Sequence, residues 1–352
     1  MNDPSDFQIT VAAVGDFMLE RRLATQDINS VREILSGFDL VVANVDTVLS
    51  DQGTPVPKWA NLRGPREIAH DLRALGVDVV AMANNHTMDF RAAGLLDTCR
   101  IYNEVGMLHA GAGDCLAAAT APVVVEVGGA RVAVLSIACT LPPESAAGPN
   151  WPGIAPVRVR YAFAVDETLL AEQPGTAPNV VTWLDEHDLE RISRDVAAAR
   201  AIAEVVLVVV HWGVPAPWRL PSQPTLQEYQ RSLGRMLIDA GADAVLGNHA
   251  HELHGIEFHR NRPIAYCLGN FWIDTIAAYP WMGRESIALG LTLSRTSPPT
   301  VSILPVLLDD GGVPRADLEN RAVKILDEQS GELGVIVEAV GGRFMVHQTT
   351  ND

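Results

Sequence analysis

Two histidines directly follow an apolar run in the stretch Val245-Leu246-Gly247-Asn248-His249-Ala250-His251-Glu252-Leu253-His254-Gly255. The apolar run, residues 242–246, ends in a glycine, and short runs of this kind predict buried strands. In an extended segment, positions i and i+2 project to the same side. We therefore expect His249 and His251 to aim their imidazoles at one point beyond a strand end. Imidazole is a common transition-metal ligand, so the stretch predicts a metal site.

The same arrangement recurs along the chain, with helical patterns between the apolar runs. Alternating strands and helices predict a largely parallel, layered α/β sheet, and such sheets bind ligands beyond the carboxyl ends of their strands. The five apolar runs end at Asp16; at Asn44 and Asp46; at Asn84, Asn85 and His86; at His211; and at His249 and His251. Five coincident strand ends predict one shared site.

The side chains at these ends are carboxylates, amides and imidazoles, without a thiolate. This mixture favours Mn²⁺, Fe²⁺ or Zn²⁺ over a structural zinc site. The candidates exceed the needs of one tetrahedral ion, whereas two ions about 3.5–4 Å apart, bridged by a carboxylate, would use them all. We therefore expect one or two divalent ions. His86, beside Asn85, is the candidate general acid or charge stabiliser.

Composition limits the possible partners and the compartment. The chain has 352 residues and a formal net charge of −17, which argues against non-specific binding to nucleic acid or to an anionic membrane surface. Its four cysteines form no CxxC pair and suit a reducing compartment. The sequence shows no signal peptide and no apolar run long enough to span a bilayer. We therefore expect a cytoplasmic protein without a membrane anchor; its oligomeric state stays open.

The chain reads as a single domain over residues 1–352, with two distinctive segments. Residues 141–185 are rich in proline and glycine and predict an insertion or lid, and residues 287–352 predict a β-rich and helical C-terminal extension. Arg158 and Arg160 lie in the insertion and could bind a carboxylate or phosphate, although a solvated strand face is the alternative. Ser30 is expected to cap a short helix that ends at Leu35. Substrate determinants are expected in the insertion and in the proline-rich loop 215–224.

The motifs at the strand ends resemble, in order and spacing, those of the CapA/PgsA family of poly-γ-glutamate capsule biosynthesis. The motifs are Gly15-Asp16-Phe17-Met18-Leu19-Glu20-Arg21, Asn44-Val45-Asp46, Ala83-Asn84-Asn85-His86-Thr87-Met88-Asp89, His211-Trp212-Gly213, Gly247-Asn248-His249-Ala250-His251 and Leu268-Gly269-Asn270-Phe271. The resemblance covers about residues 9–271. It implies a fold similar to the calcineurin-like metallophosphoesterases, a four-layer α/β/β/α sandwich of two mixed sheets.

The resemblance also implies a role for each residue. Asp16 and His251 would bind a first metal; Asn85, His211 and His249 would bind a second; and Asp46 would bridge the two. His86 matches the catalytic histidine, and Arg21 matches an arginine that contacts an anionic substrate. The predicted substrate-binding set is Arg21, Asn44, Asn84, Arg158, Arg160 and Asn270.

Several positions depart from the related patterns, among them the region of Pro215 and Pro217, where a glutamate is expected after His211-Trp212-Gly213; three others bear on the metals. Met18 stands where metallophosphoesterases usually carry a histidine, which leaves the first metal one ligand short. Asp46 stands where the family has a glutamate, and Asn248 stands where a histidine is common. The resemblance therefore implies a weaker first metal than second.

The sequence predicts a metal-dependent hydrolase that acts, through a metal-bound hydroxide, on a phosphoester or on a glutamate-like or peptide amide. The expected partner is a small-molecule or peptide-like anionic substrate. Two alternatives stay open at this stage. One is an enzyme that forms or transfers amide bonds in capsule or specialised metabolism, and the other is a non-catalytic assembly factor of a polymer synthase.

Overall fold

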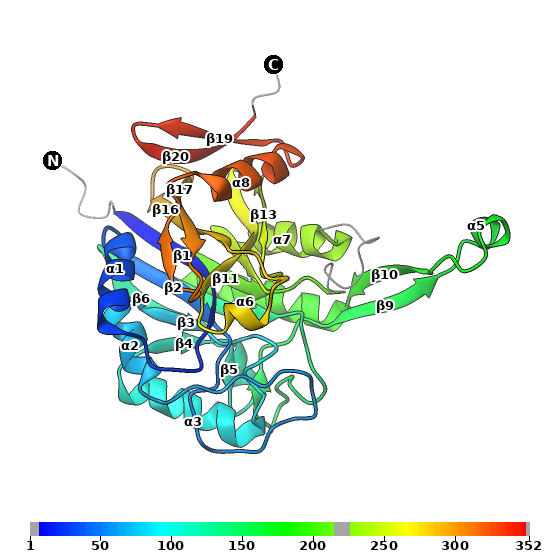
Figure 1. Ribbon diagram of the computed structural model, residues 1–352, viewed down its shortest axis with the longest axis horizontal. Coiled ribbons are helices and arrows are strands. Elements are labelled where there is room, and N and C mark those ends of the chain that lie inside the picture. The colour runs from blue at the N-terminus through cyan, green and yellow to red at the C-terminus, as the bar shows by residue number, and fades with distance from the viewer. Residues whose placement is uncertain (1–6, 215–225, 350–352) are drawn as a thin grey trace.

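The computed structural model describes residues 7–214 and 226–349, and these residues form two large mixed β-sheets with helices around them (Figure 1). The predicted α/β class with two mixed sheets is confirmed. The proline-rich loop 215–224 lies outside the described residues. No helix within residues 7–214 and 226–349 is both long enough and apolar enough to cross a membrane.

The larger sheet is built around β1 (Gln8–Met18). On one side β1 pairs in parallel with β2 (Leu40–Val45), which is followed by the parallel strands β3 (Val79–Ala81) and β4 (Leu108–Ala110). On the other side β1 pairs antiparallel with β16 (Glu285–Ser294). The remaining strands of this sheet are β17 (Thr300–Leu308), β18 (Pro314–Ala316), β19 (Val335–Val340), β20 (Arg343–Gln348) and β15 (Asn270–Ile273). The C-terminal segment thus supplies strands to the same sheet as β1.

The smaller sheet has a parallel centre and antiparallel edges. Its parallel strands are β7 (Ala130–Ala138), β11 (Val205–His211), β12 (Ala244–Asn248) and β14 (Arg262–Leu268). The edges are β6 (Val123–Val127) and β13 (Leu253–His259). β11 is buried along its whole length, which explains its uninterrupted apolar sequence: a parallel strand covered on both faces needs no polar side.

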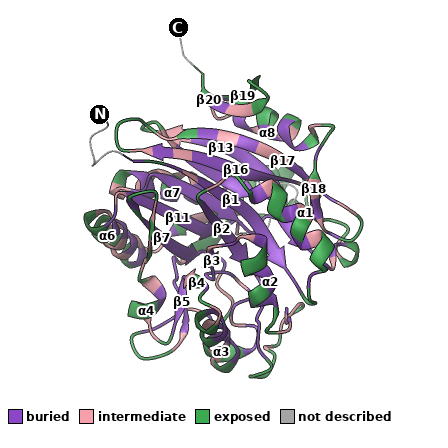
Figure 2. Ribbon diagram, turned by 90° about the vertical axis from the view of Figure 1, so that its left-hand side faces the viewer, coloured by how far each residue is buried: buried purple, intermediate pink, exposed green. Residues whose placement is uncertain are grey.

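The two sheets pack face to face, and strand alternation decides which side chains meet. Val11 and Ala13 of β1 belong to a buried cluster with Leu207 of β11, whereas Ala12 belongs to the cluster that includes Leu72 of a helix. Figure 2 shows buried strands within an outer layer of partly exposed helices. The helices are α1 (Thr25–Leu35), α2 (Ile68–Leu75), α3 (Arg91–Glu104), α4 (Leu116–Thr120), α6 (Glu186–Ile202), α7 (Glu228–Ala240) and α8 (Arg321–Gly331).

Two helix ends show how local sequence does and does not set a cap. Gly76 ends α2 with a left-handed φ of 97°, a conformation that glycine adopts readily. The prediction that Ser30 caps α1 is wrong, because the helix already begins at Thr25 and Ser30 lies inside it. The Ser30 hydroxyl donates to the Asp27 carbonyl instead, at 3.0 Å. A serine can make such a backward bond within a helix, so its presence alone does not mark a start.

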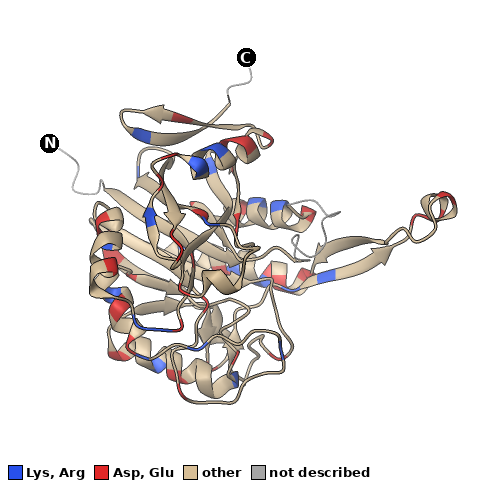
Figure 3. Cartoon of the chain, in the orientation of Figure 1, with Lys and Arg blue, Asp and Glu red and all other residues tan. Residues whose placement is uncertain are grey.

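The segment 141–185 contains an ordered arm that projects from the body of the molecule (Figure 1). Strands β9 (Val159–Ala164) and β10 (Asn179–Leu184) form an antiparallel hairpin, with α5 (Glu167–Glu172) between them. Nearer the body, β8 (Gly153–Ile154) pairs with β5 (Ala112–Gly113). Figure 3 shows basic and acidic residues interspersed along the outer helices and few on the arm's strands. The role of the segment as a lid stays a prediction.

Candidate metal centre

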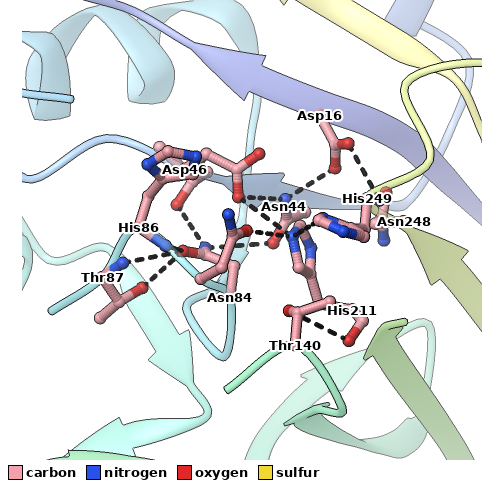
Figure 4. Close-up of polar contacts among 12 residues, drawn as sticks. Asp16, Asn44, Asp46, Asn84, His86, Thr87, Thr140, His211, Asn248 and His249 are labelled. Atoms are coloured by element: carbon pink, nitrogen blue, oxygen red, sulfur yellow. Dashed lines mark hydrogen bonds and ion pairs between the residues drawn. The ribbon is translucent and has the colours of Figure 1, made fainter. Parts of the chain in front are cut away.

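The strand ends of the two sheets bring together the side chains that the sequence singled out (Figure 4). Asp16 lies near the end of β1, Asp46 follows β2, and His211 ends β11. All three are buried, and one ligand atom of each lies within 4.8 Å of the other two. The sheets therefore converge on a compact cluster of acidic and imidazole groups.

One part of the cluster, the second-metal position, comprises Asp46, Asn85, His211 and His249. His211 Nε2 lies 2.8 Å from Asn85 Oδ1, 3.1 Å from His249 Nδ1 and 3.9 Å from Asp46 Oδ1. Ligand bonds of about 2.0–2.2 Å place neighbouring donors of one ion roughly 3–3.5 Å apart. The spacing of these four donors therefore suits a single divalent ion.

The other part, the first-metal position, comprises Asp16, Asp46 and His251. His251 Nδ1 lies 3.5 Å from Asp16 Oδ2 and 2.8 Å from Asn270 Oδ1. The Asn270 amide nitrogen donates to the carbonyls of His251 and Gly283, at 3.0 and 2.8 Å, which fixes its oxygen toward the imidazole. Asn270 thus holds His251 in place.

The backbone at the two histidines differs from the expected extended form. β12 ends at Asn248, and His249 and His251 have φ values of 100° and 58°. The inference that strand alternation aims both rings at one point is therefore wrong. A tight turn brings the rings together instead, with their centroids 6.0 Å apart. Positive φ is uncommon for residues other than glycine and is found most often where function requires it.

Two of the predicted substrate-binding amides lie behind the cluster. The Asn44 amide donates to Asp16 Oδ1 at 2.7 Å and to Asp46 Oδ1 at 2.9 Å, so it ties the two carboxylates together. The Asn84 oxygen accepts from the backbone nitrogens of His86 and Thr87, at 3.1 and 2.9 Å, and so shapes the turn after β3. Both asparagines are buried. Their positions favour a role in holding the ligands over contact with substrate.

The cluster is electrostatically costly without a cation. Burial, together with neighbouring Asp16, raises the pKa of Asp46 well above its usual range, and burial also raises the pKa of Asp16. Burial and neighbouring imidazoles lower the pKa of His211 and His249, which favours the neutral ring, the form that binds metals. Asp46 Oδ2 is buried and has no hydrogen-bond partner among the described residues. These observations fit a bound divalent cation, which would offset the carboxylate charges.

Beside the cluster, His86 is held by a lysine and an aspartate. His86 Nδ1 lies 2.9 Å from Asp89 Oδ2, and Lys58 forms an ion pair with Asp89. Lys58 Nζ also donates to the Asn85 carbonyl at 2.7 Å and lies 3.3 Å from His86 Nδ1. Burial lowers the pKa of His86, although Asp89 opposes this effect. The sequence places Asp89 in the motif 83–89 but does not indicate its role. Lys58 could not be predicted, because it comes from a loop distant in sequence.

A cleft of about 340 Å³ opens over the cluster. Its polar lining comprises Lys58, Asn85, His86, His249 and His251. Its other lining residues are Met18, Trp59, Ala60, Tyr279, Trp281 and Met282. The predicted catalytic histidine and three predicted metal ligands therefore face a space that a small molecule can enter.

The three predicted arginines lie away from this lining. Arg21 has an exposed side chain whose Nη2 donates to the Asp274 carbonyl at 2.7 Å. Arg158 and Arg160 pair with Asp188 and Asp185 near the base of the arm, at 2.9 and 2.7 Å. They line a second cavity, of about 960 Å³, which shares no lining residue with the cleft. Contact of these arginines with substrate stays a prediction.

The fold and the cluster agree with what comparison with known proteins shows. The model of the family described as bacterial capsule synthesis protein PGA_cap matches residues 10–275. The chain belongs to this family, which confirms the CapA/PgsA assignment. The matched residues include all the predicted metal ligands.

Three relatives illustrate the similarity. An uncharacterized protein of Sinorhizobium fredii is 30% identical over 310 residues, covering 76% of this chain and 66% of the relative. The capsule biosynthesis protein CapA of Bacillus anthracis is 27% identical over 282 residues, covering 76% and 60%. A probable polyglutamine synthesis accessory protein of Mycobacterium tuberculosis is 31% identical over 230 residues, covering 63% and 51%. The chain thus spans about half to two thirds of the length of these relatives.

Proposed function

We propose that the protein is a metal-dependent hydrolase that cleaves a phosphoester or an amide of an anionic substrate at the cleft. The observation that carries this proposal is the second-metal position, where His211 Nε2 lies 2.8–3.9 Å from three other donors. A divalent ion held there, Mn²⁺, Fe²⁺ or Zn²⁺, would act as a Lewis acid and lower the pKa of a water molecule. The unpartnered Asp46 Oδ2 supports the same site.

The chain's own residues supply orientation and proton transfer. Because the Asp89 carboxylate accepts a hydrogen bond, Nδ1 of His86 carries a proton, which leaves Nε2 as the ring's other polar atom. When the ring is doubly protonated, Nε2–H can stabilise a developing oxyanion and protonate the leaving group. Lys58 attracts the anion to the cleft and, through its ion pair, holds Asp89 in place.

The names of the relatives favour a second candidate. One is named as a capsule biosynthesis protein and another as a probable accessory protein of polyglutamine synthesis. Polymer synthesis requires amide bonds to be formed or chains to be assembled. The second candidate is therefore a role in polymer assembly, either as an amide-forming enzyme or as a factor without catalysis of its own.

Metal content and turnover, measured on the same preparations, test the first candidate. We expect Mn²⁺-loaded protein to hydrolyse an aryl phosphate or a γ-glutamyl amide. His211→Ala should lose bound metal and activity together, whereas His259→Ala should keep both. His259 is the matched control because it pairs with Asp239 outside the cluster. Unchanged metal content in His211→Ala would refute the metal site, and metal binding without turnover of either substrate would favour polymer assembly.

A further inference from the structure

Three aromatic rings, here called the aromatic wall, stand along one side of the cleft: Trp59, Tyr279 and Trp281. The ring centroids of Trp59 and Tyr279 lie 5.8 Å apart at 81°, and those of Tyr279 and Trp281 lie 6.4 Å apart at 77°. Trp281 also meets His251 edge to face, at 5.7 Å and 72°. The wall is therefore a connected series of rings that ends on a predicted metal ligand.

The wall presents aromatic surface to solvent at the entrance of a polar site. The exposed fraction of Trp59 is 73%, and that of Trp281 is 37%. Two buried methionines, Met18 and Met282, line the same cleft. Exposed apolar surface that rims a polar pocket is typical of ligand contact, because burying it against a ligand is favourable.

The wall is assembled from two distant segments. Trp59 follows Lys58 in the loop between β2 and α2, whereas Tyr279 and Trp281 follow the short helix η2 (Ile276–Ala278). Residues 279 and 281 lie beyond the 10–275 stretch that the family model matches. The wall thus joins the candidate metal centre to a segment outside the matched part of the chain.

We infer that the cleft takes an anion that carries a flat ring next to its reacting group, and that the aromatic wall binds this ring. The inference rests on the proposed hydrolase function and names its substrate class. The anionic end would meet Lys58 and the metal position, while the ring would pack against Trp59 and Trp281. Aromatic pairs prefer offset or edge-to-face packing with centroids 4.5–7 Å apart, the geometry that the wall already shows.

The charge of the cleft disfavours a polyanionic chain as the occupant. Lys58 is the one lysine or arginine among the described residues that line it. A glutamate polymer repeats its carboxylate at every unit, but the described lining, which includes Met18, Met282 and Trp281, offers no second lysine or arginine to pair with them, and burying an unpaired charge is costly. A volume of about 340 Å³ also suits one small molecule. Charge and size therefore both favour a ring with a single anionic group.

Binding of matched ligand pairs tests the inference without turnover. Each pair keeps one anionic group and changes the ring: phenylphosphonate against methylphosphonate, and N-benzoylglycine against N-acetylglycine. Calorimetric titration of the Mn²⁺-loaded full chain should show the ring-bearing member binding about tenfold tighter in at least one pair. Equal affinities within both pairs, or no binding of either ring-bearing ligand, would overturn the inference.

Substitutions in the aromatic wall test whether the wall causes the preference for ring-bearing ligands. Trp281→Ala and Trp59→Ala should each reduce the ring preference to about twofold or less, while Trp281→Phe should retain most of it. Trp151→Ala is the control, because Trp151 is 55% exposed but lines the other cavity. A preference that survives both alanine variants would overturn the inference. Ring preference without turnover would reject only the hydrolase function, whereas turnover without ring preference would reject only the ring subsite.

Discussion

The two predicted metal positions both include Asp46 but differ in what their other donor atoms contact. In the second-metal position, His211 Nε2 faces Asn85 Oδ1 and His249 Nδ1 at 2.8 and 3.1 Å. In the first-metal position, His251 Nδ1 lies 2.8 Å from the oxygen of Asn270, which can only accept. His251 Nδ1, the atom that lies near Asp16, thus faces an acceptor that is fixed by two carbonyls and is not a predicted ligand, whereas the contacts of His211 Nε2 are themselves predicted ligands.

Met18 enlarges this difference. It is buried and lines the cleft at the position where the resemblance to metallophosphoesterases implies a histidine, so the predicted first-metal position has one imidazole fewer. A carboxylate common to both positions therefore does not make them equal, because each ion also depends on what the remaining donors contact. We expect the second-metal position to bind its ion more tightly.

The largest expected effect comes from the shared carboxylate. Asp46→Asn should reduce bound Mn²⁺ at both positions by about a hundredfold or more in affinity, as measured by equilibrium dialysis with elemental analysis. In metal-free protein the same change should raise the melting temperature, because a neutral amide avoids burial of a carboxylate whose pKa burial raises. Retention of either ion at full affinity would show that Asp46 does not bridge them.

Replacing one histidine in each position tests which of the two binds its ion more tightly. His249→Ala should weaken binding of the tightest Mn²⁺ by about a hundredfold, whereas His251→Ala should weaken it by less than tenfold. Isothermal titration of the two variants under identical conditions measures both values. A larger loss of affinity in His251→Ala than in His249→Ala would show that the first-metal position binds its ion more tightly.

A gain of function is expected at Met18. Met18→His adds an imidazole at the first-metal position and should strengthen the second equivalent of Mn²⁺ by about tenfold, with binding of the first equivalent unchanged. Met18→Leu is the matched control, because it keeps an apolar side chain of similar size. If Met18→His leaves the affinity for the second equivalent of Mn²⁺ unchanged, the missing imidazole does not limit binding at the first-metal position.

The smallest effect is on the pH dependence of the metal-free protein. The pKa values of His211 and His249 are lowered on folding, so the unfolded chain binds protons first as the pH falls. Stability should therefore be complete above about pH 6.5 and fall below it. The raised pKa of Asp46 has the opposite effect. The stability that the protonated Asp46 contributes is lost as the pH rises through the pKa that this group has in the folded protein. Between pH 8 and pH 5, the melting temperature of His211→Gln should fall less steeply than that of the unsubstituted protein.

Much of the site follows from local sequence because strand ends in parallel sheets meet at one edge. Asp16, Asp46, His211 and His249 each follow an apolar run, and this pattern was enough to predict their meeting. The turn at His249 and His251 was not predictable from alternation, since a backbone with positive φ is imposed by its surroundings. β13 (Leu253–His259) and β15 (Asn270–Ile273) were also missed, because His254 and the glycine before Asn270 interrupt the strand pattern.

Local periodicity and spacing are enough to predict the α/β class, the family and the polar residues at the strand ends. Tertiary structure alone decided which nitrogen of each histidine faces the cluster, and that Asn44 ties Asp16 to Asp46. It also brought Lys58 to Asp89 and placed the aromatic wall beside His251. These contacts join segments far apart in the chain, and long-range packing fixes their distance and orientation.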